Sequence, residues 1–185
     1  AVKTGKLYSV IPSSGTGDCT VVRNTTATEV NSLALIESVA ANVPRLNYDS
    51  VGQNPNLLVE PQKTNLITYS EDYSHSSWLK QQASVNTSTI AAPFVNKFGV
   101  KITTNQTNAE CNIVSNSNSN LMLWIISNST ALNNNAIVGS GLFLFGAQQE
   151  ASVIPTSYIP TVESSVTRNA DVITVAPPVG TVKIT

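Results

Sequence analysis

Carboxylates come first among the residues that could do chemistry, because hydrolysis of a glycosidic bond needs two carboxyl groups that flank it. Glu71 and Asp72 are adjacent, so on a strand they would point to opposite faces. Glu150 and Glu163 each stand alone in the sequence. The spacing favours no particular pair, and we therefore interpret these four acids as solvated surface groups or turn caps.

The single histidine, His75, lies among serines that formally allow a Ser–His–Asp arrangement. No serine lies in the G-x-S-x-G elbow that exposes such a nucleophile, and no second histidine or cysteine is near enough to complete a zinc site. Cys19 and Cys111 are far apart, and because connectivity cannot be deduced from spacing, a disulfide stays open although we favour two free thiols. We predict no catalytic residue, no metal and no cofactor.

Aromatic side chains are the remaining candidates, because sugar rings stack on exposed aromatic faces. Trp124 lies inside an apolar run, which favours a place in the core. Trp78 lies in a polar segment beside Lys80, with Tyr73 close by in sequence. A core position is favoured for Trp78 as well, but Trp78 and Tyr73 are the two candidates for glycan stacking.

The composition excludes several classes of protein. Charged residues make up 11% of the chain, less than half of the roughly 25% that is usual, and Asn, Ser and Thr take their place. The net charge is −1 and the basic residues are scattered, so no positive stripe is available for nucleic acid. No apolar run approaches the roughly twenty residues of a membrane span, and the first residues lack a secretory h-region. We therefore expect a soluble protein that binds neither nucleic acid nor membrane.

The elements that position these residues are short strands separated by polar turns. Residues 32–46 are ambiguous, because Leu33, Ile36 and Val39 have helical spacing, but Pro44 ends the pattern and the neighbouring segments are extended. We therefore predict extended structure there. The expected fold is all-β, a small jelly-roll-like β-sandwich flanked by extended β arms. The predicted domains are an N-terminal arm at 1–56, the sandwich at 57–160 and a C-terminal β arm at 161–185.

The stretch from residue 142 to residue 171 is the most informative part of the chain. Large apolar side chains of both parities fill 142–145, which predicts a fully buried strand. Gly146 then breaks the run. Pro155 and Pro160 bracket Tyr158, and we predict that these four residues are structural anchors that fix the path of the exit arm.

Three blocks of the sequence resemble a module of tailed-bacteriophage virion proteins, of the head-fibre and tail-fibre type and often described as carbohydrate-binding-like. They are VNSLALIESVAANVPRLNYD at 30–49, LLVEPQKTNLITYSEDYSHSSWLK at 57–80 and LFLFGAQQEASVIPTSYIPTVESSVTRNADVI at 142–173. They occur in the order expected for an arm, an entry and an exit. The sandwich between Trp78 and Gly146 is shorter than such modules usually have.

The resemblance implies a non-enzymatic virion protein that docks to other virion proteins and displays a β-sandwich outward. It also implies a place on the virion surface after synthesis in the host cytoplasm, and self-association as a homo-trimer. Two other functions stay open. The chain could be a carbohydrate-binding module for host-surface or environmental glycans, or a glycan-cleaving spike.

Overall fold

The computed structural model describes residues 2–3, 6–7, 19–81, 83–104, 111–115, 122–125 and 141–175. Within these ranges the regular structure is entirely β-strand, and the strands pair antiparallel, which confirms the all-β, sandwich-like prediction. The chain divides into two compact units: unit 1 comprises Ala1–Gln62 and Arg168–Thr185, and unit 2 comprises Lys63–Thr167. The limits predicted for the sandwich, residues 57 and 160, stay a prediction from the sequence.

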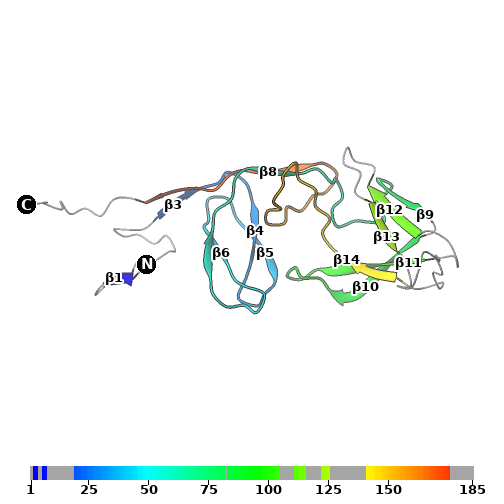
Figure 1. Ribbon diagram of the computed structural model, residues 1–185, viewed down its shortest axis with the longest axis horizontal. Coiled ribbons are helices and arrows are strands. Elements are labelled where there is room, and N and C mark those ends of the chain that lie inside the picture. Colours follow the sequence, from blue (N-terminus) through cyan, green and yellow to red (C-terminus); the bar gives the residue numbers. More distant parts are fainter. Residues whose placement is uncertain are drawn as a thin grey trace, which may run out of the picture. The chain divides into compact units, whose positions relative to one another are not determined.

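Unit 1 consists of two-stranded antiparallel pairs. Each of its four-residue strands contains two or more β-branched residues, and Asn, Asp and Gly residues form the turns between strands. The pairs are β1 (Val2–Lys3) with β2 (Lys6–Leu7), β3 (Cys19–Val22) with β16 (Val172–Val175), β4 (Ala27–Val30) with β5 (Ile36–Val39), and β6 (Arg45–Asn47) with β7 (Asn56–Leu58). The hairpins β4–β5 and β6–β7 lie side by side (Figure 1).

The ambiguous segment 32–46 is extended, as predicted, because a side chain caps the turn that precedes β5. Asn31 Oδ1 accepts hydrogen bonds from the backbone N–H groups of Leu33 (2.9 Å) and Leu35 (3.1 Å). Ala34, between them, has a φ of 57°, which a helix could not contain. The turn therefore overrides the helical spacing of the apolar residues.

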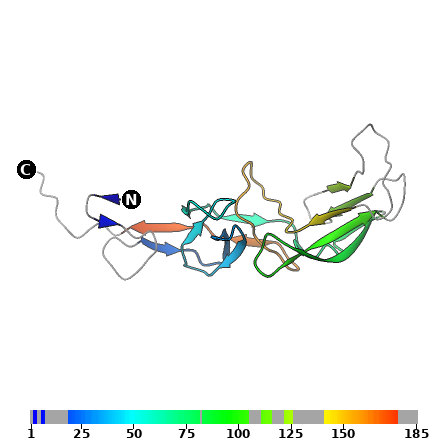
Figure 2. The same ribbon diagram turned by 90° about the horizontal axis from the view of Figure 1, so that it is seen from below.

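Unit 2 contains two three-stranded antiparallel sheets (Figure 2). In one, β11 (Phe98–Thr104) lies between β10 (Ala83–Ala91) and β14 (Gly141–Leu144); in the other, β12 (Cys111–Ser115) lies between β13 (Met122–Ile125) and β9 (Trp78–Gln81). The pairing of β10 with β11 shifts register between Thr87 and Ala91, which bends the strand. A further pair joins β8 (Lys63–Asn65) to β15 (Val166–Arg168).

The core of unit 2 takes side chains from both sheets. Trp78 of β9 and Ile102 of β11 are 2% and 0% exposed and belong to one apolar cluster, so the sheets enclose a shared interior. Full burial of side chains of this size contributes about 1.5–3 kcal/mol each. The other buried members of the cluster are Ile67, Tyr73, Ala83 and Ala147.

The prediction of a fully buried strand at 142–145 is wrong. In the described part of the chain β14 is an edge strand that pairs with β11 alone. Leu142 and Phe143 point to opposite faces of the sheet, and they are 42% and 52% exposed. The apolar side chains of β14 therefore lie on both faces of the sheet, and neither face is fully covered at this strand.

Candidate functional site

The exit loop, residues 146–161, is held at both ends by one buried amide. Asn65 is fully buried at the end of β8. Its Nδ2 donates to the carbonyl oxygens of Ala147 (3.0 Å) and Ile159 (2.8 Å). Its Oδ1 accepts from the backbone N–H groups of Ile67 and Gln149, each at 3.1 Å. One side chain thus satisfies four buried backbone groups, which would each be costly to leave without a partner.

A second buried link joins residue 70 to the end of the exit loop. Ser70 and Thr161 are 0% and 2% exposed. The Ser70 N–H donates to Thr161 Oγ1 (3.0 Å), and the Thr161 N–H donates to Ser70 Oγ (2.8 Å). Thr161 Oγ1 also donates to the carbonyl oxygen of Ile67 at 2.7 Å. This reciprocal pair of hydrogen bonds closes the exit loop against the entry segment.

Gly146 and Tyr158, two of the predicted anchors, pack against each other. Gly146 has a φ of +65°, and a Cβ atom built there would lie 3.1 Å from Cε2 and Cζ of the Tyr158 ring. The position therefore requires a glycine for both its backbone conformation and its space. The Tyr158 hydroxyl shares a hydrogen bond of 2.8 Å with Ser70 Oγ. Burial is the main cause that raises the pKa of Tyr158 above its ordinary value.

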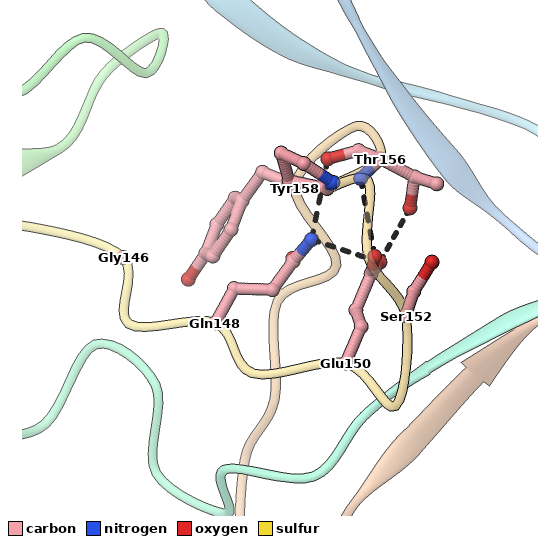
Figure 3. A pocket seen from close by; sticks show the side chains of 7 residues that line it. Gly146, Gln148, Glu150, Ser152, Thr156 and Tyr158 are labelled. Carbon is pink, nitrogen blue, oxygen red and sulfur yellow. Dashed lines mark hydrogen bonds between the residues drawn. The ribbon is translucent and has the colours of Figure 1, made fainter.

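A cleft of about 360 Å³ lies along the exit loop (Figure 3). Gln148 and Glu150 point across the loop toward the returning backbone, where Glu150 Oε2 accepts from the Thr156 N–H at 3.1 Å. Thr156 Oγ1 donates to Glu150 Oε1, and Gln148 Nε2 donates to the same oxygen at 3.0 Å. These side chains are used to close the loop. The cleft is lined by Gly146, Gln148, Glu150, Ser152, Pro155, Thr156 and Tyr158.

The carboxylate of Glu71 also has internal partners. Lys97 Nζ lies 2.7 and 2.5 Å from its two oxygens, and Tyr158 Oη donates to it at 3.2 Å. The ammonium group also lies 4.4 Å from the centroid of the Phe94 ring, within cation–π range. Glu71 is therefore part of an ion-paired cluster, whereas the sequence favoured a solvated group.

The two glycan-stacking candidates lie in the core, which corrects that assignment. Trp78 and Tyr73 are each 2% exposed, and their ring centroids are 4.7 Å apart. Trp78 Nε1 donates to the carbonyl oxygen of Tyr69 at 2.9 Å. Burial, followed by the charge of Glu71, raises the pKa of Tyr73 to about 12. Neither ring presents a face to a sugar. The side chain of Trp124 lies outside the described residues.

Unit 1 contains a buried charge network that the sequence did not predict. The Arg23 and Arg45 side chains are fully buried and flank Asp171. Arg23 Nη1 lies 2.8 Å from Asp171 Oδ1, and Arg45 Nη2 donates to Oδ2. The Glu60 N–H donates to the same Oδ2 at 3.0 Å. Buried charges persist only where such partners replace water.

A second acid extends this network. Glu60 Oε2 lies 2.9 Å from Arg45 Nη1 and 2.7 Å from Arg168 Nη1. Arg168 also donates to the carbonyl oxygen of Pro61 at 2.8 Å. Burial would raise the pKa of Asp171, but hydrogen bonds from Arg45, Arg23 and the backbone together outweigh it, and the pKa lies below its ordinary value. Asp171 is therefore ionised over the neutral range.

The Ser–His–Asp arrangement is not assembled around His75. His75 Nδ1 contacts Ser77 Oγ at 3.0 Å, both within one short turn. Asp72 instead accepts from the Ser74 N–H and hydroxyl, which helps to lower the pKa of Asp72. Among the described residues no group of acids, histidines and cysteines could hold a metal ion. The side chains of Cys19 and Cys111 lie outside the described residues.

The buried polar residues that hold distant segments together could be recognised in the sequence only as members of the three blocks. Arg45 lies in the arm block, Glu60 and Asn65 in the entry block, and Arg168 and Asp171 in the exit block. Residue type predicts surface positions for most of them, since Asp, Glu and Arg are rarely buried unless they are paired. Their presence in motifs was the one signal that they are structural.

Comparisons with protein-family models, with curated proteins and with solved structures found no match for the chain. The resemblance of the three blocks to phage fibre modules therefore stays an expectation from the sequence. In the part of the chain that the structure describes, no helix is long and apolar enough to cross a membrane.

Proposed function

We propose that the chain is a non-enzymatic structural protein of a tailed-phage virion, a head- or tail-fibre component that docks to other virion proteins and displays its sandwich outward. One observation carries the proposal. Residues of the three blocks meet through buried contacts, such as Arg45 with Asp171, which are 126 positions apart. The motif residues therefore maintain a fold and leave no obvious set for catalysis.

The engagement of the acids supports a structural role. Glu60 is held by arginines, Glu71 by Lys97, and Glu150 by Gln148 and Thr156. A glycosidase needs one carboxyl group free to protonate the leaving oxygen and a second one free to act across the bond. No observation favours the glycan-cleaving alternative. The carbohydrate-binding alternative loses its two aromatic candidates, since both are buried.

Exposed aliphatic side chains support docking. Both units leave large apolar residues in contact with solvent, as expected of surfaces that become covered in an assembly. The proposed partners are other virion proteins and further copies of the chain, with three copies as the number that the resemblance implies. The exposed large apolar residues with more than 70% of their surface in contact with solvent are Leu33, Val51, Val153 and Val162.

Mass spectrometry of purified phage particles tests this proposal. Particles produced from the genome that encodes the chain are banded on a density gradient and washed with salt. We expect peptides of the chain to remain with the particles at a fixed ratio to the major capsid protein. A chain found only in the soluble fraction of the lysate would contradict the proposal, as would release of reducing sugar from glycans by the purified chain.

A further inference from the structure

The exit loop carries an exposed apolar tip, residues 151–155. Val153 is 99% exposed and Ile154 is 70% exposed, although both are large aliphatic side chains. Isolated exposed aliphatic residues are common, but two adjacent ones at the end of a projecting loop form a compact apolar surface. The described residues of unit 2 leave this surface uncovered.

The apolar tip is held in one conformation. Its base is closed by Glu150, which accepts from the Thr156 N–H at 3.1 Å and from the Thr156 hydroxyl. Across the tip, Ser152 Oγ donates to the carbonyl oxygen of Ile154 at 3.0 Å. A loop ordered before binding loses less conformational entropy when it docks. The tip is therefore built as a preorganised binding element.

The same unit carries an apolar groove of about 260 Å³ on the sheet β10–β11–β14. Gly99 contributes a wall without a side chain, since a Cβ atom there would lie 3.2 Å from the Leu144 carbonyl oxygen. Ile90 and Phe143 on its walls are each 52% exposed. An apolar cavity of about 150 Å³ can accept a benzene molecule, so the groove has room for an aliphatic side chain. Ala91 of β10 and Leu144 of β14 also line the groove.

We propose that the apolar tip of one copy of this chain inserts into the apolar groove of a second copy. The two surfaces match in polarity, and the tip does not fill the groove of its own copy, since Val153 is 99% exposed. Their charges are also complementary: Lys101 lies beside the groove, with Nζ 6.0 Å from the Phe143 ring, and Glu150 lies at the base of the tip. The tip carries no charge that docking would have to desolvate.

A contact between two different surfaces is heterologous, and repeated copies of it close into a ring or continue as a filament. The contact therefore predicts a ring or a filament, and the homo-trimer of the proposed function would be a ring of three. The tip and groove alone are smaller than the roughly 1,200 Å² that a stable interface buries, so neighbouring residues must extend it. Phe98 and Leu142 of the same sheet, 61% and 42% exposed, are available for this.

Sedimentation velocity of the full chain tests the contact. The wild type is expected to form a concentration-dependent oligomer at micromolar concentrations. Val153→Ser/Ile154→Ser removes the tip without touching the core, and should raise the dissociation constant by about a hundredfold or more. Ala91→Phe, at an exposed position on the groove, should fill the groove and have a similar effect. Val59→Ser, the same change at a 53% exposed residue of unit 1, should leave the sedimenting mass unchanged.

Mixing the two variants gives the sharper result. The tip variant retains a groove and the groove variant retains a tip, so an equimolar mixture should form a one-to-one dimer that neither variant forms alone. An oligomer that persists in both variants, or a mixture that remains monomeric, would overturn the tip-in-groove contact. This inference rests on the self-association within the proposed function. A monomeric wild type would contradict both, whereas an oligomer insensitive to the tip would overturn the contact alone.

Discussion

Single buried polar side chains hold this protein together where an apolar core is sparse. In unit 1 the fully buried residues include Arg23, Arg45 and Arg168, and the buried apolar side chains are small by comparison. Ionic groups give less net stability than apolar packing of the same volume, because water must first be removed from them. Their geometry is specific, however, and each arginine has defined partners. The contacts of these buried arginines therefore determine which conformation unit 1 adopts.

Replacement of Asp171 by Asn tests the charge network. Arg23 and Arg45 would remain buried with one negative charge fewer, and breaking a buried pair typically costs about 3–5 kcal/mol. Urea denaturation of the variant should show this loss. The matched control is Asp49→Asn, a carboxylate in a surface turn whose hydrogen-bond donors are neutral N–H groups, which should cost much less.

The same residue predicts the acid dependence of stability. The pKa of Asp171 is lower in the folded chain than its ordinary value of 3.8, so its contribution is complete above pH 3.8 and is lost as the pH falls through the folded value. The difference between wild type and Asp171→Asn should shrink below pH 3.8. A difference that stays constant well below pH 3.8 would contradict the network.

Glu29 predicts the opposite dependence. Burial is the largest cause that raises its pKa above 4.5, and Glu37, directly opposite on β5, raises it further. Its ionisation is therefore unfavourable in the fold, and stability falls as the pH rises from 4.5 through the folded value. Glu29→Gln should be more stable than wild type at pH 7, by roughly 0.2–1 kcal/mol for removal of an opposed like charge.

Thermal denaturation at pH 7 and at pH 4 checks this prediction. The advantage of Glu29→Gln should disappear at the lower pH, where the carboxyl group is protonated. Glu163→Gln, the same change at an exposed carboxylate, serves as the control and should leave the melting temperature at pH 7 close to that of wild type. A variant less stable than wild type at pH 7 would show that the ionised form is favoured.

At the scale of single elements, the position of a loop or strand depends on side chains that lie far away in sequence. Features set by local sequence could therefore be predicted, and features set by distant contacts could not. The strands follow from β-branched runs and turn residues, so the all-β class and the extended segment 32–46 were predictable. The place of β14 at an edge was not, because the pattern of Leu142 and Phe143 records polarity and cannot tell which neighbours cover a strand. The burial of Trp78 likewise depends on a core contributed by both sheets.

Gly146→Ala tests the junction of β14 and the exit loop. The φ of +65° disfavours alanine, and the new Cβ atom would contact the Tyr158 ring, so we expect a loss of about 1–3 kcal/mol in the free energy of unfolding. In a Tyr158→Ala background the added loss should be smaller, because the ring is gone and the backbone strain alone remains. Equal losses in both backgrounds would mean that the ring does not press on this site.

At the scale of the whole molecule, two units are each closed by buried contacts between distant parts of the chain, while aliphatic side chains stay exposed on both. This combination suits a component whose units are closed by their own buried contacts and whose exposed aliphatic side chains bind neighbouring proteins. The most direct measurement is a density map of the phage particle that the chain is proposed to join. The account predicts density for the unit 2 sandwich on the outside of the particle, with the apolar tip against a neighbouring copy. A particle map at side-chain resolution without the chain would contradict it.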